Sequence, residues 1–299
     1  MDQTTGYTKA TMNSGKVRNR GIELQLDGTP VKTKNFTWNS TFTWAKNYNK
    51  VLSLAAGLTD GQTIAYTGGT NCALIAKVGG SIGDIYGYKL KRAPDGQVVW
   101  KDGITARTTE FEYVGNAYPA WKAGFSNEFS YKNFRVSILF DGQWGGIVYS
   151  QTHHKMTEHG TLKHTLKYRE NPNFEVVGEG VMLDERGQYV PNNVPISVSK
   201  YYADYWRRAN VETNSFDASF LKLREARIEY TIPSAGLNKI GIERLTLALY
   251  GRNLAMWTKD FPVYDPEVAT LNNGTIVPGS EMVQLPSTRT MGFNLTLKF

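Results

Sequence analysis

One cluster in the chain contains residue types that could bind a metal ion. All four histidines fall within twelve residues, at His153, His154, His159 and His164. Imidazole is a common zinc ligand, so clustered histidines raise the possibility of a metal site. Neither cysteines nor a standard ligand spacing accompany them. We therefore expect a polar loop here and no metal.

A second segment has the spacing of a nucleophile motif. Ser197 and Lys200 fit the S-x-x-K pattern, but two fixed positions arise easily by chance and the companion motifs are absent. The sequence does not bring a nucleophile, a base and an orienting group together elsewhere. We therefore expect no enzymatic activity and no cofactor.

Two carboxylates lie on either side of a rigid residue in Asp265-Pro266-Glu267. They could bind a sugar hydroxyl or Ca²⁺, which takes oxygen ligands. They could equally fix their own loop through turn hydrogen bonds. Asp265 and Glu267 are therefore candidate substrate-binding residues, with a structural role as the alternative.

Tryptophans in the predicted loops could stack on sugar rings, since an aromatic face suits the apolar face of a pyranose. The candidates for substrate binding are Trp144, Trp100 and Trp121, and Trp144 is favoured because it follows a strand and precedes Gly145-Gly146. The alternative is that these rings anchor the chain at a membrane interface or fold the loops.

The composition suits a β-protein with two kinds of surface. Of the 299 residues, 40% are hydrophobic and 12% aromatic, a balance typical of a barrel with a wet lumen. The net charge is +7, but the basic residues are scattered, so we expect no nucleic-acid partner. The single cysteine, Cys72, excludes an intrachain disulfide. No apolar run approaches the roughly 18 residues of a spanning helix.

Alternation of apolar and polar residues is the dominant pattern, and it predicts β-strands. The clearest strand covers the last eleven residues, and it has the roughly 10 residues that a tilted strand needs to cross a bilayer. Phe36 to Trp44 repeats this pattern. The apolar face of the last strand consists of Met291, Phe293, Leu295, Leu297 and Phe299.

Short and long connections alternate between the predicted strands. Outer-membrane barrels have this arrangement, with short periplasmic turns and longer extracellular loops. We therefore predict an all-β fold, a partial transmembrane antiparallel β-barrel of about seven or eight strands with long extracellular loops. The short turns are expected at 28–35, 132–133 and 234–241, and the long loops at 45–119, 145–214 and 255–286.

One predicted strand, Phe216 to Ile232, breaks the pattern. Lys222 and Arg224 share a face with Ala226 and Ile228. A cation on the lipid face at mid-bilayer would cost about 2–4 kcal/mol. Either a bulge near Leu223 shifts the phase of the strand, or both cations lie above the membrane; we favour the second explanation.

Several segments, in this order and spacing, resemble the SusC/RagA family of TonB-dependent outer-membrane transporters, in the C-terminal part of their barrel. The resemblance extends along nearly the whole chain. The residues that carry it are Asn19-Arg20-Gly21-Ile22-Glu23-Leu24, Ile85-Tyr86-Gly87-Tyr88, Tyr113-Val114-Gly115-Asn116, Pro119, Ser219-Phe220-Leu221-Lys222-Leu223-Arg224, Tyr230-Thr231-Ile232-Pro233, Gly251-Arg252-Asn253-Leu254, Trp257, Asp265-Pro266-Glu267 and Gly292-Phe293-Asn294.

The resemblance implies a barrel of about 22 strands, a size at which the lumen holds a plug. It implies that residues 1–299 are a C-terminal part of such a barrel in the cell outer membrane, without the plug domain and signal peptide. Expected partners are outer-membrane lipid, the missing N-terminal barrel and plug, and TonB through that missing part. A SusD-like surface lipoprotein would cap the mouth, and the pair would import large nutrients, either glycans or peptides.

The alternative is a soluble β-rich carbohydrate-binding domain, such as a sandwich. The opening Met1-Asp2-Gln3 lacks the basic and apolar regions of a signal peptide, which favours this alternative or a fragment. The two hypotheses differ in expected solubility: a natural chain that is soluble and monomeric without detergent would contradict the transporter hypothesis.

Overall fold

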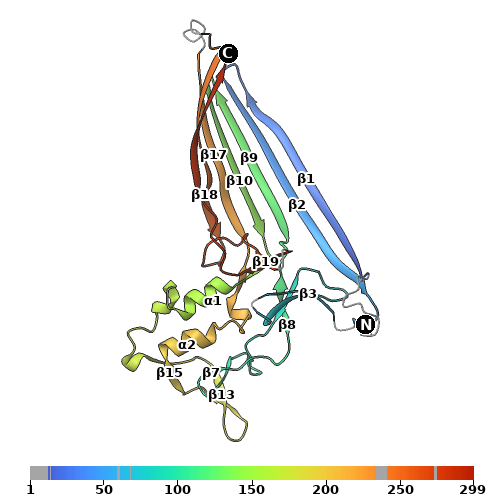
Figure 1. The fold of residues 1–299 in the computed structure, drawn as a ribbon, viewed down its shortest axis with the longest axis vertical. Coiled ribbons are helices and arrows are strands. Elements are labelled where there is room, and N and C mark those ends of the chain that lie inside the picture. Colours follow the sequence, from blue (N-terminus) through green and yellow to red (C-terminus); the bar gives the residue numbers. More distant parts are fainter. Residues whose placement is uncertain (1–12, 14, 59–60, 68, 234–240, 273–274) are drawn as a thin grey trace, which may run out of the picture.

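The chain is described here from a computed structural model covering residues 13, 15–58, 61–67, 69–233, 241–272 and 275–299. A single twisted antiparallel sheet of seven strands dominates it, in the order β1-β2-β9-β10-β17-β18-β22 (Figure 1). This confirms the predicted all-β fold with about seven strands. The strands are β1 (Gly15–Lys32), β2 (Phe36–Leu54), β9 (Trp121–Tyr131), β10 (Phe134–Trp144), β17 (Phe220–Ile232), β18 (Arg244–Thr258) and β22 (Thr290–Lys298).

Within this sheet, each strand pairs with the one that follows it in chain order. The sheet is therefore a simple meander with short connections at one end and long ones at the other. The short connections are 33–35, 132–133 and 233–243, and the predicted turn at 234–241 lies almost wholly outside the described residues. The long connections are 55–120, 145–219 and 259–289, and they gather at the end of the sheet opposite the C-terminus (Figure 1).

The register gives the sheet one apolar and one polar face. Residues that pair directly across strands point to the same side. Phe42 pairs with Phe125, which pairs with Phe140, so the aromatic residues of three strands share one face. Many of these side chains are exposed, Phe293 to 78%. Because apolar area in water costs about 25 cal/mol per Å², a face of this kind requires an apolar surrounding.

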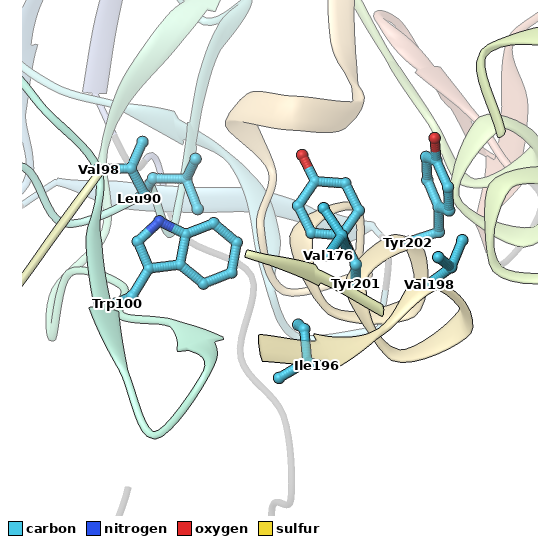
Figure 2. Packing of buried hydrophobic residues seen from close by; sticks show 8 residues of the cluster. All are labelled: Leu90, Val98, Trp100, Val176, Ile196, Val198, Tyr201 and Tyr202. Atoms are coloured by element: carbon cyan, nitrogen blue, oxygen red, sulfur yellow. The ribbon is translucent and has the colours of Figure 1, made fainter. Parts of the chain in front are cut away.

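No second layer covers this face in the part of the chain that the structure describes, and the hydrophobic core lies instead among the long connections. The largest core cluster contains Trp100 and Tyr201 (Figure 2). A second contains Cys72, Ile85 and Tyr149. A soluble sandwich would bury the inner face of its sheet instead, so this arrangement argues against the carbohydrate-binding alternative.

The long connections fold into one body of short strands and helices. Its sheets are β3 (Gln62–Thr67), β4 (Cys72–Ala76), β5 (Asp84–Gly87) and β8 (Glu112–Asn116); β14 (Tyr189–Pro191), β13 (Val181–Leu183), β6 (Val99–Lys101) and β7 (Ile104–Thr105); β16 (Ser215–Asp217), β11 (Ile147–Ser150) and β21 (Ser280–Glu281); β12 (Glu175–Val177) with β15 (Pro195–Ser197); and β19 (Thr270–Asn272) with β20 (Thr275–Val277). Its helices are α1 (Gln151–Glu158) and α2 (Val198–Tyr205), with 3₁₀ turns at Lys163–Leu166, Pro172–Phe174 and Glu212–Asn214. No helix in the described ranges is long and apolar enough to cross a membrane.

Several strand boundaries and the two helices differ from the sequence-based expectation; for example, the strand predicted from Phe216 begins at Phe220. β2 continues to Leu54, ten residues past Trp44; the sequence does not show this because the apolar–polar alternation fades between Ala45 and Lys50. β1 runs through the expected turn at Gly28 with a bulge before Val31. β18 likewise continues to Thr258. The helices are only eight residues long, too short for a clear 3.6-residue period.

Candidate functional site

A bulge in β17 decides where its two cations lie. The register of β17 shifts by one residue between Leu223 and Glu225, leaving Arg224 without a cross-strand partner. Leu221 and Leu223 then continue the apolar face, and Lys222 pairs with Asp141 on the polar face. Our preferred explanation, that both cations lie above the membrane on the apolar face, is therefore replaced by the other one, the bulge.

Lys222 lies in a buried ion-pair cluster. Its Nζ donates to both carboxylate oxygens of Asp265 at 2.7 and 2.8 Å, and also to the carboxylate of Glu267. The side chains of Lys222 and Asp265 are only 3% and 5% exposed. Burial pushes the pKa of Asp265 upward, but hydrogen bonds from Lys222 and the Glu267 amide outweigh this, so its pKa lies below the ordinary value. Asp265 is therefore held ionised.

Arg224 extends the same cluster to the neighbouring strand. Its guanidinium donates from Nε and Nη2 to Asp141 of β10, with Nη2 to Oδ2 at 3.0 Å, and Nη2 also lies 2.5 Å from Glu267 Oε2. Lys222 and Arg224 therefore form ion pairs with the candidate substrate-binding carboxylates, Lys222 with both Asp265 and Glu267 and Arg224 with Glu267. The cluster ties the 259–289 connection to the polar face, as the loop-fixing interpretation of these carboxylates predicts.

Beside this cluster the polar face is hollowed at the loop end. The hollow has a volume of about 470 Å³. A row of paired residues crosses it, from Glu23 through Ala45 and Lys122 to Gln143. Ala45 leaves room between the charged side chains of Glu23 and Lys122, which lie two strands, or about 10 Å, apart. Neither takes part in an ion pair with the described residues.

A second hollow, of about 390 Å³, adjoins the first and shares Ala45 and Lys122 with it. Amide and phenol side chains such as Asn47, Asn116 and Tyr118 line it. The two hollows together offer hydrogen-bonding groups and, besides the paired carboxylates of Asp141 and Glu267, one charge of each sign, which suits a large polar ligand. Glu23, Lys122 and Gln143 were not among the predicted site residues, because only the register across the strands brings them together.

Trp144 lines neither of these hollows, and Trp121 borders the second one. They pair across β9 and β10 on the apolar face, with ring centroids 6.4 Å apart and planes 10° apart. Lys259 Nζ lies 5.3 Å from the centroid of Trp144. Tryptophan near the end of a membrane-spanning strand is typical of an interfacial belt. The position of Trp144 matches the anchoring alternative, whereas Trp121 pairs with it on the apolar face and also lines the second hollow.

Trp100 is 2% exposed and therefore has no free ring face for a sugar (Figure 2). Its Nε1 donates to the Glu179 carbonyl at 3.0 Å, and its ring stacks on Tyr201 with centroids 6.0 Å apart. Gly178 lies so close that a Cβ there would come within 2.1 Å of the indole. The position of Trp100 corresponds to the loop-folding alternative.

The histidines pack as part of the loop body. His153 Nδ1 hydrogen-bonds Asn214 Oδ1 at 2.9 Å, and His154 Nδ1 hydrogen-bonds the Trp206 carbonyl at 2.8 Å. Burial lowers the pKa of His153 to about 4, although the Asn214 hydrogen bond opposes the shift. Within the described ranges, no three His, Cys, Asp or Glu side chains are grouped to hold a metal ion.

A meander of long strands with one apolar face, one polar face and long loops at a single end defines a portion of an outer-membrane β-barrel wall. The whole chain aligns with solved structures of this class, two of which are the RagAB peptide transporter and the RagAB peptide importer in its "open-open" state. The TM-scores are 0.65 and 0.66 at 19% identity, and the chain covers 31% and 30% of those chains. No protein-family model matches the chain.

Relatives by sequence agree with this fold. The chain is 29% identical to TonB-dependent receptor P26 of Formosa agariphila, over 99% of its own length and 30% of the relative's. It is also 26% identical to TonB-dependent receptor SusC of Bacteroides thetaiotaomicron. That match covers 49% of the chain and 16% of the relative. The chain thus spans about a third or less of the curated relatives it matches. These relatives confirm the sequence resemblance: the chain is similar to a portion of TonB-dependent receptors of the SusC/RagA type.

Proposed function

We propose that this chain forms part of the wall and mouth of an outer-membrane transporter that imports a large polar nutrient, a glycan or a peptide. The observation that carries the proposal is the pair of adjoining hollows at the loop end of the polar face, which share Lys122. In a barrel the polar face lines the lumen, so a ligand entering from the loop side meets these hollows first.

The proposal assigns residues 1–299 to one barrel portion in the cell outer membrane, with no catalysis of its own. Coupling to TonB is assigned to a part of the transporter outside this chain. A SusD-like lipoprotein is assigned to the loop body. Support for this partner comes from the similarity to SusC and to the RagAB peptide transporter and importer.

The hollow residues provide the test of import. In the bacterium that encodes the chain, Glu23→Ala with Lys122→Ala should lower uptake of the cognate oligosaccharide or oligopeptide several-fold, at an unchanged level in the outer membrane. Thr296→Ala, on the same face near the other end of the sheet, is the matched control and should leave uptake unchanged. Unchanged uptake in the double variant would overturn the assignment of the hollows.

The partner assignment has its own test. The protein carrying this chain, extracted from the outer membrane in detergent, should co-purify with a surface lipoprotein. Replacement of the exposed hairpin tip, Glu185 to Gln188, by a short glycine linker should leave the pairing of β13 with β6 intact, so loss of the lipoprotein from that variant would locate the interface. Purification without any lipoprotein would contradict the assignment.

A further inference from the structure

A groove crosses the apolar face next to its tryptophans, on the side away from the loop end. It has a volume of about 470 Å³ and is lined mainly by aromatic and small residues. Trp121 and Trp144 border it toward the loop end, Trp257 flanks it on β18, and Phe125 and Phe140 lie on its other side. Trp144 and Trp257 are half exposed, at 52% and 53%.

Small residues in one cross-strand row create this groove. The row runs from Trp44 through Ala123 and Gly142 to Leu221 and Trp257. Two neighbouring members of this row, Ala123 and Gly142, have almost no side chain. The next row on the apolar face toward the loop end carries a pair of tryptophans, and the next one away from it carries a pair of phenylalanines. The wall is therefore recessed at Ala123 and Gly142.

The fold fixes this recess. A Cβ on Gly142 would lie 2.5 Å from the carbonyl oxygen of Phe220 in the adjacent strand, which is backbone and cannot easily move aside. Phe220 lies close to the bulge in β17 that turns Lys222 toward the polar face. Gly142 therefore cannot be filled by a larger residue without disturbing the strand pairing.

We propose that this groove holds one acyl chain of a membrane lipid from the leaflet on the loop side. The groove is continuous with the apolar face that the barrel presents to lipid, so its surroundings are hydrocarbon. An empty apolar recess would forfeit dispersion contacts on one side, and a flexible chain restores them. The tryptophans place the end of the groove nearest the loops at the depth of the membrane interface.

The charges beside the groove indicate that it recognises the acyl chain of the lipid and not its headgroup. Lys259 is the cation nearest to Trp144, but its Nζ is paired with Asp217 Oδ2 at 2.6 Å. Its charge is therefore already balanced within the protein. Occupancy should accordingly be the same for a zwitterionic and an anionic lipid.

The test is a cryo-EM map of the complete transporter in nanodiscs of phosphatidylcholine and, separately, of phosphatidylglycerol. The expected result is one ordered acyl chain in the groove in both lipids, better ordered than density along the rest of the apolar face. Ala123→Leu should remove it. Ala226→Leu, the same change in a second apolar hollow near Ile138 and Ile228, is the control and should retain it.

The wild-type map decides the proposal even if Ala123→Leu fails to assemble. An empty groove, density no stronger than along the remaining face, or a protein segment from another copy in the groove would overturn it. So would an ordered chain that persists in Ala123→Leu. Density in phosphatidylglycerol alone would contradict recognition through the chain.

Discussion

Lys222 and Asp265 form a buried ion pair, with Nζ 2.7 Å from Oδ1, that joins β17 to the 259–289 connection. The two residues are 43 positions apart. The pair lies on the polar face because of the bulge at Arg224. The bulge in β17 therefore determines that the 259–289 connection is attached to the polar face of the sheet.

Replacement of Lys222 by Met should release that loop. Removing one member of a buried pair leaves the other charged and uncompensated, which costs about 3–5 kcal/mol. Limited proteolysis within 259–289 and thermal unfolding in detergent measure the effect. Arg252→Met is the control, because the Arg252–Glu225 pair has a 64% exposed arginine side chain and should contribute at most about 1 kcal/mol. Equal stability of the two variants would contradict the role of the pair.

The last strand should tolerate a cation on one face only. Leu295→Arg places a charge on the apolar face and should cost about 2–4 kcal/mol near the bilayer midplane. Thr296→Arg, the next residue, points to the polar face, where it pairs with Thr246, and should cost much less. The folded fraction in the outer membrane, read from heat-modifiable gel mobility, distinguishes them. Equal amounts of both variants would argue against a lipid-facing side.

Trp100 should act on stability. Truncation of a buried tryptophan to alanine typically costs about 3–5 kcal/mol, so Trp100→Ala should loosen the loop body and speed hydrogen exchange around Tyr201. Trp144→Ala removes a half-exposed ring from the apolar face and should have a smaller effect on the same amides. A Trp100→Ala protein that exchanges normally but fails to bind a glycan would restore the stacking hypothesis.

The loop body should lose stability in acid. The pKa of His153 is lowered to about 4 by burial, so the unfolded state binds more protons as the pH falls below about 6.5. The stability that the neutral ring contributes is present above pH 6.5 and is lost as the pH falls toward 4, by at most about 3 kcal/mol. Hydrogen exchange in 151–158 at pH 7 and pH 5 measures this loss. His153→Gln should flatten the dependence, and an unchanged pH profile in that variant would point to another group.

Local pattern was sufficient for the sheet and insufficient for the site. The alternation around Phe293 and the turn at Lys132 predict strands, their faces and the short connections, because these depend on neighbouring residues alone. The bulge at Arg224 obscures the same pattern, since alternation cannot tell a shifted phase from a misplaced charge. Sequence alone left two roles open for Trp100, stacking on a sugar or folding the loops, because its burial depends on contacts with residues far along the chain such as Tyr201.

The sequence by itself therefore determined the class of fold, the two faces of the sheet and the resemblance to SusC/RagA transporters, because each rests on order and spacing along the chain. Only the tertiary structure decided which residues meet. Glu23 and Lys122 lie 99 residues apart and share a hollow because β2 pairs with both of their strands. Lys222 belongs to a strand and Asp265 to the 259–289 connection, and their contact depends on the bulge in β17 and on the path of that connection, which alternation along the chain does not reveal.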